Sequence, residues 1–211
     1  MAKSLDSFVR WSDCLLAATL AAMGRRLYRS DAQSLVLEIE RLSKSALVHC
    51  TKMDIDMLGR ALVSGEDRRF RSHPGIDTRG LIRALLIRFR GGALQGASTI
   101  TQQLVRVLTR DYRLSVRRKF REMCLACVID RAVAKDVQIS AYLRVGYFGW
   151  RMTGCDQAVK RLRLASPLDA PAAAEVVARL RYPQPRNPTD RQLTRVRQRA
   201  AYIVSRFIEP K

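Results

Sequence analysis

An all-α fold is predicted for this chain by its composition, by the helical spacing of its apolar residues and by its helix-capping residues. Apolar residues make up 47% of the 211 residues, and aromatic residues only 7%. Alanine, leucine, arginine and valine are abundant, which favours helices over sheets. The length suits one well-buried domain and is too short for two large ones.

Apolar stripes at spacings of three and four residues predict helices over residues 53–68 and 115–134 and in the stretch that ends at Phe207. Helices are also predicted over 135–143 and 170–179. The stripe residues are Met57, Leu58, Ala61 and Leu62 in the first helix, Val116, Phe120, Met123 and Cys127 in the second, and Leu193, Val196, Ala200, Ile203 and Phe207 in the last.

Turn and cap signals separate these helices. A glycine-rich loop at 91–96 precedes a helix that opens at Ser98 or Thr99. Thr99 and Gln102 have the spacing of a capping box, in which each residue satisfies a backbone N–H near the other. Residues 146–154 are predicted to form a loop with aromatic anchors.

The segment 79–90 is predicted to be a basic amphipathic helix. Its apolar residues share one face, and arginines flank that face on both sides. Such a pattern suits a membrane interface, and a core-facing helix with a solvated rim explains it equally well. The apolar residues are Leu81, Ile82, Leu85, Leu86 and Phe89, and the flanking arginines are Arg83, Arg88 and Arg90.

The N-terminal segment contains an apolar run, residues 14–24, followed by Arg25 and Arg26. The run is shorter than the roughly 20 residues that a helix needs to span a bilayer. It fits a surface-lying or partial membrane anchor and an ordinary soluble helix equally well. We therefore divide the chain into an N-terminal segment, 1–35, and a main domain, 36–211.

The net charge is +20, from 39 basic and 19 acidic residues. Such a surface attracts polyanions, which include nucleic acids, anionic lipid headgroups and phosphorylated substrates. The basic residues are spread along the chain, and no nucleic-acid-binding motif or aromatic stacking pattern accompanies them. A basic helical nucleic-acid-binding protein is therefore an alternative that explains the charge alone.

Five cysteines in a chain of this length do not form a disulfide framework. Cys124 and Cys127 form a CxxC pair, but they lie in a strongly helical stretch without a second pair or nearby histidines in sequence. We interpret them as small core residues. An odd number of cysteines leaves at least one free thiol in an exported protein.

Four motifs in order carry a resemblance to a known family. Residues 66–77 read EDRRFRSHPGID, residues 96–106 read GASTITQQLVR and residues 118–122 read RKFRE. Residues 135–149 combine K-x-x-x-I-x-x-Y-L with GYFG. The set is similar to the peptidoglycan glycosyltransferase domain, which occurs alone in monofunctional transglycosylases and as the N-terminal module of bifunctional penicillin-binding proteins. The resemblance covers about residues 50–208.

The resemblance implies a lysozyme-like helical fold with a membrane-associated subdomain. It implies an enzyme that polymerises lipid II into glycan strands, with inversion at the anomeric carbon and release of polyprenyl pyrophosphate. The expected partners are lipid II, the growing glycan strand, the periplasmic face of the bacterial inner membrane and penicillin-binding transpeptidases, and not nucleic acid. No obligatory cofactor is expected, although the family resemblance is compatible with a divalent Mg or Mn ion.

Two glutamates are the expected catalytic residues. A sugar hydroxyl is a poor nucleophile, so a carboxylate must take its proton during attack, and Glu66 matches the family's general base. Glu122 resembles the second acidic residue, which lies nearer the pyrophosphate and is the candidate ligand for a divalent ion. Glu122 also lies four residues after Arg118, and a helix-surface ion pair would explain that spacing without catalysis.

The leaving pyrophosphate gathers negative charge, so cations and oriented donors must lie where it forms. A helix N-terminus near Ser98 favours anions. Asp67, Phe70 and His73 could equally shape the loop after Glu66, and a structural role is favoured for His73. The resemblance assigns substrate binding to Asp67, Phe70, His73, Ser98, Thr99, Gln102, Gln103, Arg106, Arg118 and Lys119.

The chain departs from the family pattern at Arg144, where the fourth motif usually has asparagine. This departure keeps a second alternative open, a diverged and weakly active or inactive scaffold of cell-wall assembly. A third alternative is a lysozyme-like hydrolase, which shares the fold. The segment from Ser98 to Arg106 argues against hydrolysis, because it suits a phosphate leaving group.

Overall fold

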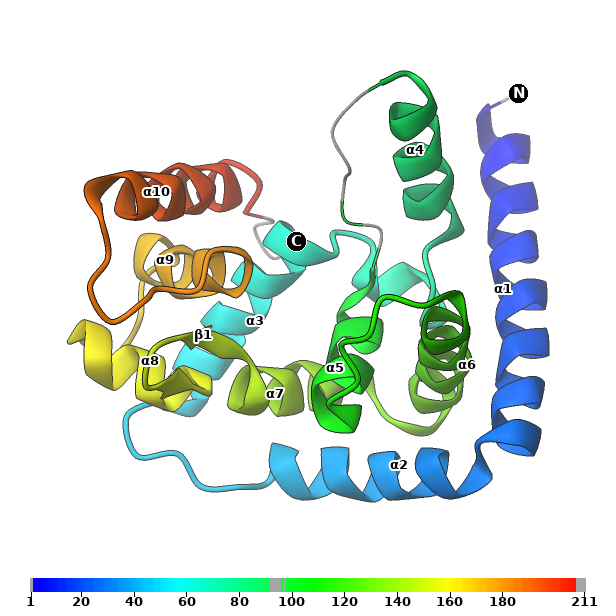
Figure 1. Ribbon diagram of the computed structural model, residues 1–211, viewed down its shortest axis with the longest axis horizontal. Helices are drawn as coiled ribbons and strands as arrows, with labels where there is room; N and C mark the ends of the chain where they lie inside the picture. Colours follow the sequence, from blue (N-terminus) through cyan, green and yellow to red (C-terminus); the bar gives the residue numbers. More distant parts are fainter. Residues whose placement is uncertain (1, 92–95, 97, 208–211) are drawn as a thin grey trace. The chain divides into compact units, whose positions relative to one another are not determined.

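The computed structural model describes residues 2–91, 96 and 98–207 (Figure 1). The chain is divided into two compact units, and each is built from two separate stretches. Unit 1 comprises Met1–Glu38 and Arg69–Lys135, and unit 2 comprises Ile39–Arg68 and Asp136–Lys211. Helices dominate both units, which confirms the all-α prediction. The expected boundary between an N-terminal segment, 1–35, and a main domain, 36–211, concerns a possible membrane anchor. It is not the division into these two units, and it stays a prediction.

Unit 1 is organised around α6, which packs against both α1 and α5 (Figure 1). Gly24 of α1 allows close approach, because a Cβ there would lie 2.9 Å from the carbonyl oxygen of Cys124. The elements are α1 (Ala2–Leu27), the first part of α2 (Arg29–Ser43), the short 3-10 helix η1 (Phe70–Ser72), α4 (Thr78–Phe89), α5 (Ile100–Thr109) and α6 (Val116–Ala132).

Unit 2 is organised around α9, which packs against both α3 and α10. The buried stripe of α3 includes Leu58, Ala61 and Leu62, and α10 buries Val196 and Ile203, as their spacing predicts. The elements are α3 (Lys52–Glu66), α7 (Lys135–Val145), β1 (Tyr147–Gly149), β2 (Met152–Thr153), α8 (Cys155–Leu162), α9 (Ala170–Arg181) and α10 (Asp190–Val204).

A buried carboxylate fastens the start of α3. Asp54 completes a capping box with Thr51 and also accepts hydrogen bonds from Ser166 Oγ and Leu168 N, both at 2.6 Å. Burial opposes ionisation of Asp54, but these hydrogen bonds outweigh it and lower its pKa. The carboxylate therefore ties α3 to the connection between α8 and α9.

The segment 146–154 is a short antiparallel hairpin, not the loop that was expected. Its backbone also pairs with a distant residue, because Trp150 N donates to Gln184 O at 2.7 Å and Gln184 N donates to Phe148 O at 3.1 Å. Phe148 is fully buried and is one of the expected aromatic anchors. The sequence-local pattern missed the strands because part of their pairing comes from Gln184.

The apolar stripe predicted for α6 is wrong at its first residue, since Val116 is 87% exposed. From residue 124 to residue 129 the helix is buried on all sides, because α1 and α5 cover different faces of it. The CxxC residues Cys124 and Cys127 lie in this core, as expected. The predicted glycine loop at 91–96 falls largely outside the described residues.

Exposed apolar side chains are concentrated on two helices of unit 1. On α4 they are Leu81, Ile82, Leu86 and Phe89, and on α1 they are Leu15, Leu16, Met23 and Leu27. The two helices contact each other. Among the described residues, no helix combines the length and the apolar character needed to cross a membrane.

Gly75 and Gly91 offer a matched test of backbone constraint, because both have positive φ angles, 89° and 75°. A Cβ at Gly75 would lie 2.6 Å from the Ala126 carbonyl oxygen, whereas no atom of the described residues lies within 4 Å of one at Gly91. We expect Gly75→Ala to lower the free energy of unfolding by about 3 kcal/mol and Gly91→Ala by about 1 kcal/mol. Urea unfolding checks this, and equal losses would contradict the close approach to α6.

Candidate functional site

Glu122 on α6 is the centre of a cluster of charged side chains in unit 1. Its side chain is only 3% exposed. Arg106 on α5 donates Nε to Oε2 at 2.9 Å and Nη2 to Oε1 at 3.1 Å. Arg118 Nη1 donates to Oε2 at 2.7 Å, and Lys119 Nζ donates to Oε1 at 2.6 Å. The ion pair expected from the spacing of Arg118 and Glu122 is confirmed, but it is buried and shared with two further cations.

Two polar residues at the start of α5 extend this cluster. Lys119 Nζ donates to Ser98 Oγ at 3.0 Å and to Gln102 Oε1 at 2.6 Å, and Arg106 Nη2 donates to Ser98 Oγ at 3.2 Å. The predicted capping box is therefore half formed. Thr99 Oγ1 accepts from Gln102 N at 3.2 Å, but the Gln102 side chain accepts a hydrogen bond from Lys119.

The cluster carries excess positive charge, because three cations surround one carboxylate. Burial opposes ionisation of Glu122, but hydrogen bonds from Arg106 and Lys119 outweigh it and lower its pKa. Burial also lowers the pKa of Lys119, and the charges of Arg106 and Arg118 add to that effect, so Glu122 compensates only in part. The arrangement suits an anion that supplies further negative charge.

The first-motif loop is attached to this cluster within unit 1. Thr99 Oγ1 donates to Gly75 O at 2.7 Å. Lys135 Nζ donates to His73 O at 2.9 Å and lies 4.3 Å from the centre of the Phe70 ring. Phe70 is fully buried and His73 is 3% exposed, with their rings in edge contact. Both side chains shape the loop, and their expected contact with substrate stays a prediction.

Glu66 and Asp67 lie in unit 2, at the end of α3. Arg199 on α10 donates Nη2 to Glu66 Oε1 at 3.1 Å and to Gly65 O at 2.5 Å. Sequence reasoning missed Arg199, which lies 133 residues from Glu66 in the chain. The only local signal for Arg199 was that it directly precedes Ala200, a member of the apolar stripe of the last helix.

The structure thus brings together in unit 1 most of the predicted binding residues, while Glu66 belongs to unit 2. Asp67 is 7% exposed and its backbone N–H bonds to Val63 O at 3.2 Å. Gln103 is half-buried on α5. The residues brought together are Ser98, Thr99, Gln102, Arg106, Arg118, Lys119 and Glu122.

An arginine-rich hollow of about 480 Å³ adjoins the cluster through Arg118. Two of its arginines are neutralised, because Arg113 pairs with Asp111 at 2.7 Å and Arg121 pairs with Asp31 at 2.8 Å. The bond from Arg113 lowers the pKa of Asp111 to about 2. The lining residues are Tyr28, Asp31, Asp111, Arg113, Ser115, Arg117, Arg118 and Arg121.

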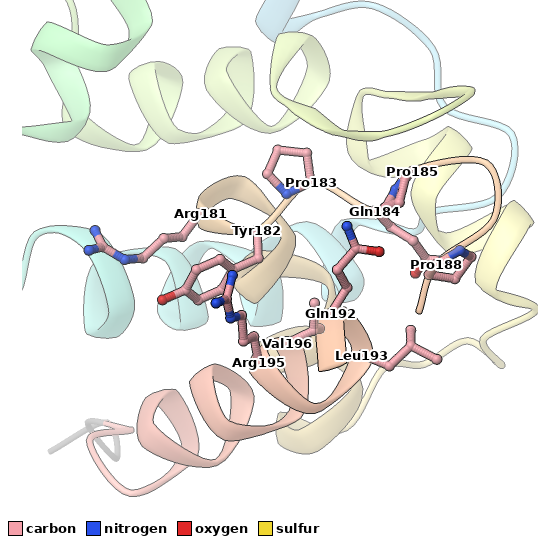
Figure 2. Close-up of a pocket in the computed structure, with 10 residues that line it drawn as sticks. All are labelled: Arg181, Tyr182, Pro183, Gln184, Pro185, Pro188, Gln192, Leu193, Arg195 and Val196. Carbon is pink, nitrogen blue, oxygen red and sulfur yellow. The ribbon is translucent and has the colours of Figure 1, made fainter. Parts of the chain in front are cut away.

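Unit 2 contains a smaller pocket of about 180 Å³ beneath the proline-rich loop (Figure 2). Figure 2 shows the loop passing over the start of α10, whose side chains form the other wall. No carboxylate lines this pocket, so we do not assign the chemistry to it. The lining residues are Arg181, Tyr182, Pro183, Gln184, Pro185, Pro188, Gln192, Leu193, Arg195 and Val196.

The surroundings of Glu122 do not fit a divalent cation. Both carboxylate oxygens already accept hydrogen bonds from cationic side chains, which would repel the ion. Within the described part of the chain, no three histidine, cysteine or acidic residues form a group that could hold a metal. Use of Mg or Mn stays a prediction, and we derive no step through it.

Comparison with known proteins agrees with the four motifs. Residues 33–208 match the transglycosylase family. Penicillin-binding protein 1A of Rickettsia conorii is 30% identical over 190 residues, which cover 87% of this chain and 24% of that protein. The protein of the same name from Neisseria flavescens is 31% identical over 188 residues, covering 87% and 23%. That of Escherichia coli K12 is 39% identical over 102 residues, covering 48% and 12%.

These matches, together with the helical fold, place the protein among enzymes that transfer glycosyl groups. The chain belongs to the transglycosylase family, and the family expected from the sequence is confirmed. It spans about a quarter of the length of the Rickettsia and Neisseria relatives.

Removing the Glu122 charge should destabilise unit 1. We expect Glu122→Gln to lower the free energy of unfolding by about 3 kcal/mol, because three cations lose their shared carboxylate. Lys119→Met is the control and should cost less, since Glu122 keeps both arginines. Denaturant unfolding measures both, and a larger loss from Lys119→Met would show that Glu122 is not the hub.

Acid should weaken the same interaction. The pKa of Glu122 is lowered by folding from its ordinary value of 4.5, so the unfolded chain binds more protons between the two values. The stabilisation is complete above about pH 4.5 and is lost as the pH falls through the folded-state pKa. Unfolding free energies measured from neutral to acid pH should decline less steeply for Glu122→Gln than for the wild type. Parallel curves would contradict the shift.

Proposed function

We propose that this enzyme polymerises peptidoglycan glycan strands from lipid II, with release of polyprenyl pyrophosphate. The observation that carries the proposal is the convergence of Arg106, Arg118 and Lys119 on one buried carboxylate beside Ser98. Three cations and one anion leave two positive charges in excess, and the pyrophosphate leaving group supplies the complementary negative charge. The family membership and the penicillin-binding relatives support this substrate class.

Glu66 is the proposed general base that takes a proton from the attacking sugar 4-hydroxyl. Its ion pair with Arg199 at 3.1 Å fixes the position of the carboxylate that would accept the proton. The same contact holds the end of α3, because Arg199 also bonds to Gly65 O. Arg199 is therefore a positioning residue for Glu66 in this proposal.

The arginine-rich hollow is the proposed place for part of the leaving pyrophosphate. Arg117 lines it and, within the described residues, has no ion-pair partner. Arg118 reaches both the hollow and Glu122, so an anion there would contact the same charge network. Inversion at the anomeric carbon and the use of lipid II belong to this proposal and follow from the family resemblance.

The exposed apolar surface of α4 and α1 is the proposed contact with the periplasmic face of the inner membrane. Phe89 is 85% exposed and Ile82 is 53% exposed, which is costly in water and favourable in a lipid interface. Arg83 on α4 and Arg90, which directly follows it, are exposed and can contact anionic headgroups. Substrate held by its lipid would then reach unit 1 along the membrane.

Arg144 is used in packing within unit 2. Its Nη1 donates to Ser140 O at 3.0 Å, and its Nε and Nη2 donate to Ser45 O at 3.2 Å. The replacement of the family's asparagine therefore gives α7 a link to the loop before α3. This contact is a structural use of the cation, and the polymerisation assay decides between an active enzyme and the scaffold alternative.

Polymerisation of purified lipid II in detergent tests the function directly. Wild type should produce glycan strands, and Glu66→Gln should lose about 10²–10⁴-fold in rate because the proton acceptor is gone. Glu40→Gln, which removes an exposed carboxylate of unit 2, is the matched control and should keep full activity. A folded wild type without product, or an active Glu66→Gln, would refute the proposal.

Binding to vesicles tests the membrane contact. We expect the double variant Leu86→Asp/Phe89→Asp to bind vesicles of anionic phospholipid at least about 10-fold more weakly, because two apolar side chains lose their lipid contact. Met53→Asp is the control, since Met53 is 69% exposed in unit 2. Co-sedimentation measures both, and equal binding by all three proteins would refute the assignment of α4.

A further inference from the structure

Two cysteines that are distant in sequence meet inside unit 2. Cys50 ends the loop before α3 and is 8% exposed, while Cys155 is the first residue of α8 and is fully buried. The two thiols are hydrogen bonded to each other. They belong to the two separate stretches of chain that make up this unit.

Neighbouring residues hold both cysteines in place. Asp156 Oδ1 accepts hydrogen bonds from three consecutive backbone N–H groups, those of Val48, His49 and Cys50, at 3.0, 2.6 and 3.1 Å. Arg144 binds the same loop at Ser45. The backbone of Cys50 is therefore fastened to the residue that follows Cys155.

Gly154 fixes the backbone on the other side of Cys155. Its φ is +82°, and a Cβ there would lie 2.6 Å from Arg144 O, so the chain packs closely at this point. Gly154 N also donates to Gly146 O at 2.8 Å. The backbone is therefore constrained next to both cysteines.

The surroundings of Cys155 favour its thiolate. The hydrogen bond from Cys50 lowers the pKa of Cys155, burial opposes this, and the charge of Arg144 adds to the lowering. The same hydrogen bond and burial raise the pKa of Cys50. A thiolate is the nucleophile in disulfide exchange, so Cys155 is the better attacking group.

We propose that Cys50 and Cys155 are joined in a disulfide when the chain meets an oxidant. The geometry supports it, because Cys50 N is bonded at 3.1 Å to Asp156, the residue after Cys155, and the two thiols are each other's hydrogen-bonding partners. The loop 44–50 is mostly exposed, so local opening gives a reagent access to the sulfurs.

The oxidant is a disulfide, either a small one or that of a thiol oxidoreductase. The Cys155 thiolate attacks one sulfur of that disulfide, forms a mixed disulfide and releases one thiolate. Cys50, after losing its proton to water, then attacks the Cys155 sulfur and releases the second thiolate. Two cysteine thiols are oxidised, one external disulfide is reduced to two thiols, and the electrons balance.

The CxxC pair of α6 does not share these features. Cys124 and Cys127 are three residues apart within a continuous helix, and burial raises the pKa of both thiols, that of Cys127 to about 12. Deeply buried thiols with raised pKa values react slowly. They therefore serve as an internal comparison for the pair in unit 2.

The bond would link the two stretches of unit 2 across the whole of Arg69–Lys135, which belongs to unit 1. A cross-link between residues about 100 positions apart strongly restricts the unfolded chain. Unit 2 would then stay assembled through opening events that separate its two stretches.

Mass spectrometry of the full chain tests the proposal. Cys14→Ser removes the exposed thiol and leaves four cysteines. After treatment with oxidised and reduced glutathione, alkylation under denaturing conditions should modify two cysteines, against four in the reduced protein. Proteolysis should yield one linked peptide pair that contains Cys50 and Cys155. The unfolding midpoint should rise by roughly 10 °C on oxidation.

Two further variants in this background separate the pairs. Cys124→Ser/Cys127→Ser should keep the midpoint shift and leave no cysteine for alkylation after oxidation. Cys50→Ser should lose the shift and leave all three remaining cysteines open to alkylation. Four alkylated cysteines in the oxidised parent, or a linked peptide that joins Cys124 to Cys127, would overturn the proposal whatever the folding of the variants.

Discussion

The geometry of unit 1 depends on the buried carboxylate of Glu122. Arg106 comes from α5, while Arg118 and Lys119 come from the first turns of α6, and their charges repel each other in the absence of the glutamate. One carboxylate with two oxygens satisfies all three and thereby sets the approach of α5 to α6. The position of Ser98 and the half-formed cap at Thr99 follow from the same bonds.

Glu66 and Glu122 lie in different environments, which matches the different roles proposed for them. Glu66, the proposed base, lies at the end of α3 and forms an ion pair with Arg199 on α10. Glu122 is committed to three cations, so its lowered pKa makes it a poor proton carrier and a good organiser of positive charge. The two glutamates are the same residue type, so their different environments account for the proposed roles of Glu66 as a base and Glu122 as an organiser of the anion site.

Local signals in the sequence predicted most helices and much of the site. Periodicity and caps located α3, α6, α9 and α10, because each has an apolar stripe or a capping residue within its own segment. The misses have distant causes. Trp150 bonds to Gln184, Glu66 pairs with Arg199, and the Gln102 side chain accepts a hydrogen bond from Lys119. The partners are far apart in the chain, so a short window of sequence does not indicate these contacts.

The interleaved construction of unit 2 has a consequence for synthesis. As the chain emerges from the ribosome or an export channel, α3 appears early, yet its buried face packs against α9, which is made more than 100 residues later. Leu58 and Leu62 stay exposed to water until then, and such exposed apolar surfaces promote aggregation or bind chaperones. Unit 1 can collapse in the meantime, because its last residue, Lys135, precedes the rest of unit 2. Unit 1, which contains α6, can therefore be completed before unit 2, although α3 of unit 2 is translated before α6.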